Sequence, residues 1–251
     1  MSTDVDPEGP LGVVAEGWEG VRGAELLRAR LPKEDVVVVA DHAFAPYARR
    51  RPADVAARVA DLAAQLQAEG AKALLLAGGF ASFEARPPVG ELPVRGLECG
   101  LRDAVHVAAG RPVAAVFSPA EVKPAVLAQT IRGLRGGGSV TLIEQRGDAP
   151  ADVLERAARA TPDLAVLLLL TPVAYAAGDA LRALVPPEVV VIDALDSAAR
   201  FLADDVRKRR LLAHHGLRAG RITTFATRGQ STAGGRPALP LTAAAALQRR
   251  L

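Results

Sequence analysis

The side chains of this sequence best suited to moving protons or attacking a substrate are Glu16, Asp41, His42 and Cys99. A carboxylate beside an imidazole, as in Asp41 and His42, can act as an acid/base pair. Neighbouring side chains in an extended segment point to opposite sides, so we expect Asp41 to close a turn and His42 to be exposed. Cys99, with Glu98 beside it, could be a lone thiol nucleophile, but its position favours a small residue packed at a strand-to-helix turn.

The composition excludes several kinds of site. Cys99 is the single cysteine, so the chain has no internal disulfide and no multi-thiolate metal site. A net charge of +3 does not indicate a polyanion partner, and the turn from Ala77 to Ser82 lacks the spacing of a P-loop or a dinucleotide fingerprint. We therefore predict no cofactor, no metal and no nucleic-acid partner. The start of the chain does not resemble a signal peptide, and the longest apolar run, Leu164 to Leu170, is too short to span a bilayer, so we expect a cytoplasmic protein without membrane contact.

Short β-branched runs alternate with longer amphipathic stretches, which is typical of βα units around a mostly parallel sheet. The clearest helix is predicted from Pro52 to Glu69, because proline suits the first turn and Gly70 is placed for a C-cap. We predict strands at Leu11 to Ala15, Val36 to Ala40, Ala73 to Ala77, Val94 to Leu97, Pro112 to Phe117, Ser139 to Ile143, Leu164 to Leu170, Val189 to Ile192 and Arg221 to Ala226.

The helix-strand unit that ends in AGGFAS has a second copy that ends in LTPVAY. Two such units predict an α/β fold of two similar parallel-sheet halves that face each other across a cleft. Ligands of open α/β sheets bind beyond the carboxyl ends of the strands, so the site is expected there. We predict a first domain from residues 11–95 and about 197–228, a second domain from residues 96–196, a disordered tail at residues 1–10, and an irregular tail with a short helix at residues 229–251.

In order along the chain, the segments at the strand ends resemble those of glutamate racemase, of the aspartate/glutamate racemase superfamily. The resemblance covers about Leu11 to Gly229 and rests on an ordered series of segments. The family's Asp-Ser-Gly turn, Asp-Thr-Ala segment and Pro-Tyr-Gly segment correspond to Ala15-Glu16-Gly17, Asp41-His42-Ala43 and Pro46-Tyr47-Ala48. Its cysteine motifs, Ala-Cys-Asn-Thr-Ala-Ser and Gly-Cys-Thr-His, correspond to KALLLAGGFAS and DLAVLLLLTPVAY, and its Ile-Asp-Ser strand end corresponds to VVVIDAL.

The chain departs from the family at the residues that perform the reaction. The two catalytic cysteine positions are Gly78 and Leu170, the neighbours of the first are Gly79 and Phe80, and Pro172 replaces the histidine of the second motif. Racemisation removes the Cα proton on one face and returns a proton on the other, so it needs two positioned acid/base groups. Glycine and leucine cannot move a proton. We therefore predict no catalytic residue and a pseudoenzyme of the racemase fold.

The resemblance also implies which residues line the cleft. Tyr47 belongs to the segment that lines the substrate pocket in the family, and Thr171 keeps the hydroxyl that follows the second cysteine. Glu16 places a carboxylate where the family has a small hydroxyl. Two interpretations are open: it repels an acidic amino acid in the cleft, or it is a solvated residue of the turn. The predicted cleft residues are Ala15, Glu16, Asp41, Pro46, Tyr47, Gly79, Phe80 and Thr171.

Three functional interpretations remain open from the sequence. The first is a non-catalytic protein that binds a small ligand or a protein partner and regulates cell-wall precursor supply or another protein. The second is an active racemase that uses Asp41, His42, Glu16 or Cys99 in place of the cysteines. The third is another cleft enzyme of the superfamily, such as a decarboxylase or a hydantoin-type isomerase. The family also leads us to expect a homodimer, although the segment RPPVG alters a region near the cleft.

Overall fold

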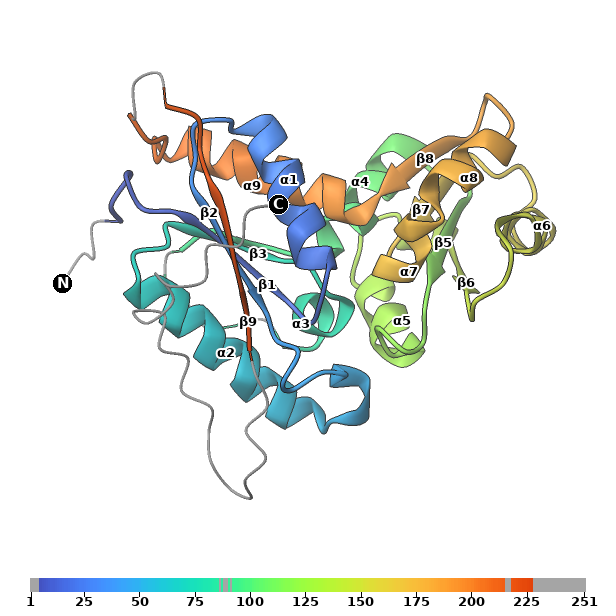
Figure 1. Cartoon of the computed structure of the whole chain (residues 1–251). Coiled ribbons are helices and arrows are strands. Elements are labelled where there is room, and N and C mark those ends of the chain that lie inside the picture. Colours follow the sequence, from blue (N-terminus) through green and yellow to red (C-terminus); the bar gives the residue numbers. More distant parts are fainter. Residues whose placement is uncertain (1–4, 86, 88–89, 91, 215–217, 228–251) are drawn as a thin grey trace.

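The structure is a computed structural model, and it describes residues 5–85, 87, 90, 92–214 and 218–227. These residues form two separate parallel sheets, each with helices packed on it, which lie side by side in Figure 1. The predicted fold class of two parallel-sheet α/β halves is confirmed.

The first sheet has the strand order β4-β3-β1-β2-β9. Its inner strands are entirely or almost entirely buried because helices cover both faces, as is usual for parallel sheets. Helix α2 (Pro52–Ala68) packs on one face, and α1 (Glu19–Arg30) packs on the other. The strands are β1 (Leu11–Ala15), β2 (Val36–Ala40), β3 (Ala73–Leu76), β4 (Val94–Arg95) and β9 (Ile222–Ala226).

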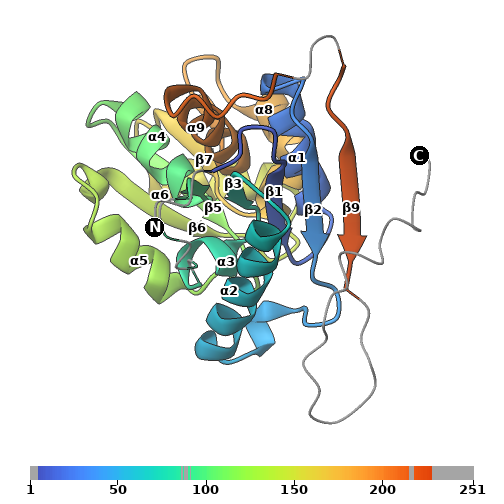
Figure 2. The ribbon, with the colours of Figure 1, turned by 90° about the vertical axis from the view of Figure 1, so that its left-hand side faces the viewer.

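The second sheet has the strand order β6-β5-β7-β8. Its strands are β5 (Val113–Phe117), β6 (Val140–Glu144), β7 (Val166–Leu169) and β8 (Val190–Asp193). Its helices are α4 (Glu98–Ala108), α5 (Pro124–Arg132), α6 (Pro150–Ala160), α7 (Pro172–Ala176) and α8 (Gly178–Leu184). Figure 2 shows α4 and α5 on the side of the molecule opposite β9.

Helix α9 (Ala194–Lys208) carries the chain from the second half back to the first, and it contacts both α1 and α4. Asp193 begins this helix as its N-cap, because its carboxylate accepts hydrogen bonds from the backbone N–H groups of Leu195 and Asp196. The predicted division between residues 196 and 197 falls inside α9, which packs against both halves.

Several boundaries differ from the sequence prediction. Strand β4 ends at Arg95 rather than Leu97, because Leu97 already has helical backbone angles and begins α4. Helix α2 ends at Ala68, one residue before the predicted Glu69. Gly70 follows with a φ of 87°, the conformation in which glycine favours helix termination. After β3, α3 (Gly79–Phe83) has only 5 residues.

The first described residues, 5–10, belong to the segment that was predicted as a disordered tail. Val5 packs against both hydrophobic core clusters, and the Nζ of Lys72 donates a hydrogen bond to the carbonyl oxygen of Pro7. Lys72 is fully buried and also pairs with Glu34, so the segment covers a buried charge pair that would otherwise meet water. The predicted C-terminal tail of residues 229–251 lies outside the described residues, as do residues 1–4.

Candidate functional site

The first family cysteine position, Gly78, lies two residues after the end of β3 and is the N-cap of α3. A Cβ atom built at Gly78 would lie 3.7 Å from Oε1 of Glu19. That oxygen also accepts hydrogen bonds from the backbone N–H groups of Glu16 at 2.8 Å and Gly17 at 3.0 Å. A carboxylate at the start of α1 therefore lies where a side chain at position 78 would point.

Glu19 is a residue that the sequence prediction missed. In the sequence, Glu19 is an acidic residue in the first turn of a helix. Such residues are common because they interact favourably with the helix dipole, so this position alone does not indicate a functional site. Only the approach of α1 to the end of β3 identifies it as a neighbour of Gly78.

Glu16 is partly buried beside this position, and burial raises the pKa of its carboxyl to about 7. The nearby carboxylates of Glu19, Glu121 and Asp41 raise it further, whereas a hydrogen bond from the backbone N–H of Tyr47, 2.7 Å from Oε2, lowers it. The predicted carboxylate of the opening turn thus lies in an acidic environment and can exchange a proton near neutral pH.

Asp41 is a fully buried structural carboxylate rather than a free acid/base group. The guanidinium of Arg58 donates two hydrogen bonds to it, at 2.8 and 2.6 Å, and the hydroxyls of Tyr47 and Thr227 donate at 3.0 and 2.8 Å. Its backbone oxygen accepts from Phe44 and Ala45, so the residue closes a turn, as predicted. Arg58 and Thr227, which come from α2 and the end of β9, were not predicted from the sequence.

Tyr47 was predicted to line the cleft, but its side chain is fully buried in the core on the α2 face of the sheet. Burial raises the pKa of its phenol, and so do the charge of Asp41 and its hydrogen bond to that residue. The hydroxyl is therefore a permanent donor to Asp41. Pro46 is exposed, and Ala15 is buried at the end of β1.

The second family cysteine position is closed by core packing. Leu170 follows β7 and is fully buried, as is Thr171. The Oγ1 of Thr171 accepts a hydrogen bond from the backbone N–H of Ser118 at 3.0 Å, which ties the ends of β7 and β5 together. Pro172 begins α7. The hydroxyl of Thr171 is therefore engaged within the second half.

The two halves are in direct contact over α3. A Cβ atom at Gly79 would lie 2.2 Å from the carbonyl oxygen of Glu121, so the loop before α5 touches the backbone of α3. Lys123 extends from the same loop, with its Nζ 3.4 Å from Oε2 of Glu84 and 5.8 Å from the centre of the Phe80 ring. Phe80 is 1% exposed. The predicted cleft residues Gly79 and Phe80 are thus covered by the opposite half.

The other candidate groups lie away from this contact or are chemically inactive. His42 is exposed, as predicted, and its ring packs edge-on against that of Trp18. Cys99 is buried in α4, and burial, followed by the charge of Glu98, raises the pKa of its thiol to about 12. A thiol that stays protonated at neutral pH is a poor nucleophile, which supports the prediction of a small packed residue. No group of His, Cys, Asp and Glu within the described ranges could hold a metal ion.

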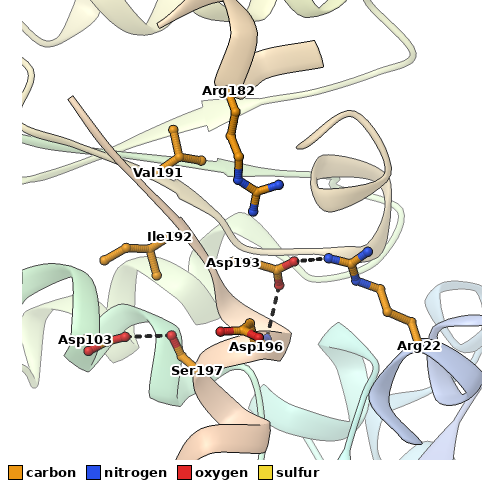
Figure 3. Close-up of a pocket in the computed structure, with 8 residues that line it drawn as sticks. All are labelled: Arg22, Asp103, Arg182, Val191, Ile192, Asp193, Asp196 and Ser197. Carbon is orange, nitrogen blue, oxygen red and sulfur yellow. Dashed lines mark hydrogen bonds and ion pairs between the residues drawn. The ribbon is translucent and has the colours of Figure 1, made fainter. Parts of the chain in front are cut away.

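A polar cavity of about 200 Å³ lies where Arg22 of the first half meets the second half (Figure 3). The guanidinium of Arg22, on α1, donates to Oδ2 of Asp193 at 2.5 Å across the junction. Ser197 donates to Asp103 at 2.7 Å, and Arg30 makes a bidentate pair with Asp196. These pairs fix α9 against α1 on one side and α4 on the other.

Comparison with known proteins agrees with this architecture. No protein-family profile matches the chain. A protein of Ralstonia pickettii named glutamate racemase is 30% identical over 166 residues, which is 65% of this chain and 57% of that protein. A Roseiflexus protein of the same name is 27% identical over 238 residues, 87% of each chain. The chain thus spans less than two thirds of the first relative's length and most of the second's.

Solved structures show the same fold. The glutamate racemase of Thermus thermophilus superimposes with a TM-score of 0.67 at 24% identity and covers 89% of both chains. That of Francisella tularensis gives a TM-score of 0.71 at 19% identity and covers 90% of both chains. Two parallel-sheet halves joined by a returning helix, with their strand ends in contact, define a protein of the racemase fold. In sequence the chain is similar to glutamate racemases, and its fold is that of the aspartate/glutamate racemase superfamily. No helix among the described residues is long and apolar enough to cross a bilayer.

Proposed function

We propose that this protein is a non-catalytic member of the superfamily, with a binding or regulatory role in the cytoplasm. The observation that carries the proposal is the state of the two family cysteine positions. Gly78 has no side chain, and Leu170 is a fully buried hydrocarbon. A racemase needs an acid/base group on each face of the substrate's Cα, and each such group contributes about 10² to 10⁴-fold to the rate.

The surrounding structure supports the same conclusion. Lys123 and the backbone of Glu121, from the opposite half, contact α3 directly after the first family cysteine position. Glu19 adds negative charge there, as does Glu16 above its pKa of about 7, and an amino acid with an anionic side chain would then be repelled. The relatives are named glutamate racemases, and we propose that the regulated process is the supply of D-glutamate to cell-wall precursors.

The test is exchange of the α-proton of both enantiomers of glutamate and aspartate in deuterated water, followed by NMR at high protein concentration. An active glutamate racemase is the positive control. We expect no exchange above that of buffer. We also expect that the chain does not restore growth of a bacterium that lacks glutamate racemase and depends on added D-glutamate. Protein-dependent exchange of either amino acid would overturn the proposal.

A second candidate function is proton transfer by a carboxylate in place of the first cysteine. It is favoured by the 3.7 Å between Oε1 of Glu19 and the Cβ position of Gly78, and by the pKa of about 7 at Glu16. In this case exchange would be measurable, Glu19→Gln would abolish it, and Glu25→Gln, an exposed change on the same helix, would not. Leu170 supplies no group on the other face, so such an enzyme would exchange the α-proton without efficient racemisation.

A further inference from the structure

A second hollow lies at the opposite edge of the second sheet from the candidate site. It has a volume of about 610 Å³ and is formed where α4 and α5 end and the chain turns back towards β5 and β6. Ligand-binding cavities usually have about 300 to 1,000 Å³, so the hollow is large enough for a small molecule. Its lining residues are Arg102, Val105, His106, Ala109, Gly110, Leu134, Arg135 and Gly136.

The floor of the hollow is apolar, and the ionisable groups in its lining are cationic or neutral. Val105 and Leu134 are half-buried, and Gly136 lies against Val105, since a Cβ atom there would approach Cγ1 of Val105 to 3.0 Å. Arg102, His106 and Arg135 are exposed, and none of the described residues that line the hollow is a carboxylate. An apolar surface with cationic groups beside it is complementary to an anion that carries a hydrocarbon group.

Among the described residues, the two arginines that line the hollow lack the acidic partners that many other arginines of this protein have. Arg22, Arg30, Arg58 and Arg95 each pair with an aspartate, whereas neither Arg102 nor Arg135 makes an ion pair with any described residue. Arg111 follows the lining residue Gly110, and Arg132 ends α5. Both are exposed, and within the described part of the chain they too lack an acidic partner. Unpaired positive charge therefore gathers around the hollow.

The helix dipoles explain only part of this arrangement. His106 and Arg132 lie in the last turns of α4 and α5, where a cation stabilises the free carbonyl groups. Arg102 lies in the first half of α4, and Arg135 lies beyond the end of α5, so the dipole effect, which is confined to the terminal turn, does not account for them. The described lining also contains no Phe, Tyr or Trp, the side chains on which nucleobases most often stack.

We propose that this hollow binds a small organic anion, a carboxylate with a short aliphatic chain. Arg102 and Arg135 donate hydrogen bonds to the carboxylate, and the hydrocarbon lies on Val105 and Leu134. The hollow shares no residue with the racemase-like site, so the proposal stands whether or not the protein catalyses proton transfer. It assigns a binding site to a surface of the second half that the candidate site does not use.

The test is calorimetric titration of the full chain with butanoate, hexanoate, hexan-1-ol and inorganic phosphate. We expect saturable binding of hexanoate, an affinity that rises about fourfold for each added methylene group, and negligible binding of the alcohol and of phosphate. Arg102→Gln and Arg135→Gln should each weaken hexanoate binding by about tenfold or more, because each removes a charged hydrogen bond. Arg28→Gln, which removes an exposed arginine from α1, is the matched control and should leave the affinity unchanged.

NMR shows where on the protein the ligand binds. In methyl-labelled protein, hexanoate should shift the signals of Val105 and Leu134 and leave those of Val14 and Val39, in the first sheet, unchanged. The proposal is overturned if hexanoate does not bind saturably at millimolar concentration, or if hexan-1-ol or phosphate binds equally well. It is also overturned if Arg28→Gln weakens binding as much as the two lining variants do. Thermal unfolding of each variant checks that the fold is retained.

Discussion

The Cβ position of Gly79 lies 2.2 Å from the carbonyl oxygen of Glu121, so the two halves of this protein meet backbone to backbone at the strand ends where its relatives carry their first cysteine motif. Any side chain at position 79 must move the loop that contains Glu121. The absence of a side chain at Gly79 therefore permits this close approach of the two halves.

The first prediction concerns this glycine. Gly79→Ala should lower the free energy of unfolding by about 1 to 3 kcal/mol, because the added methyl group clashes with backbone that cannot rotate away. Gly138→Ala is the control, since nothing lies within 4 Å of a Cβ atom there and its φ is not positive. Urea denaturation of both variants measures the difference. Equal free energies of unfolding for the two variants would mean that the halves can move apart at position 79 without loss of stability.

The second prediction concerns the buried carboxylate of Asp41. Asp41→Asn should destabilise the protein by about 3 to 5 kcal/mol, because it leaves the guanidinium of Arg58 buried without a counter-charge. Asp54→Asn breaks a pair of the same type between Asp54 and the exposed Arg51, and it should leave the stability unchanged. Denaturant midpoints compare the two. A small effect at Asp41 would show that water reaches Arg58 in the folded protein.

The third prediction is a pH dependence caused by Glu16. The pKa of its carboxyl is about 7 in the folded protein, above the usual value of 4.5. Between pH 4.5 and pH 7, therefore, the carboxyl is ionised in the unfolded chain and still protonated in the folded chain. The contribution of Glu16 to stability is therefore largest at low pH and declines as the pH rises through 7.

Glu16→Gln removes this dependence. The variant should match the wild type at pH 4 and be more stable at pH 8 by roughly 1 to 2 kcal/mol, after allowance for the partial exposure of the group. Unfolding free energies measured across this range test the sign. Parallel curves for the two proteins would contradict the raised pKa.

The fourth prediction concerns Cys99. Its burial and raised pKa should make the thiol unreactive towards an aromatic disulfide reagent in the folded protein at pH 8. The same reagent should label one thiol per chain rapidly in denaturant. Labelling of the native protein at the rate of a free cysteine would show instead that α4 opens readily.

The sequence was most informative about the regular elements. The runs Leu11–Ala15 and Val36–Ala40 were predicted with the bounds that the structure has, because both are apolar strands in the middle of a parallel sheet. The helix from Pro52 was predicted nearly to its last residue from its apolar stripe and Gly70. The limits of β4 and β7 were less accurate, because apolar residues continue past the last ladder hydrogen bond into the core.

The candidate site was only partly predictable. The sequence by itself determined which residue types are missing, since Gly78 and Leu170 cannot carry a proton in any fold. Only the tertiary structure decided which side chains surround these positions. It places Glu19 beside Gly78 and Lys123 near the ring of Phe80, and it pairs Asp41 with Arg58 and Thr227. Each of these contacts joins elements that are distant in the chain. Such contacts depend on how the two sheets and their helices pack, and the spacing of residues along the sequence does not reveal that packing.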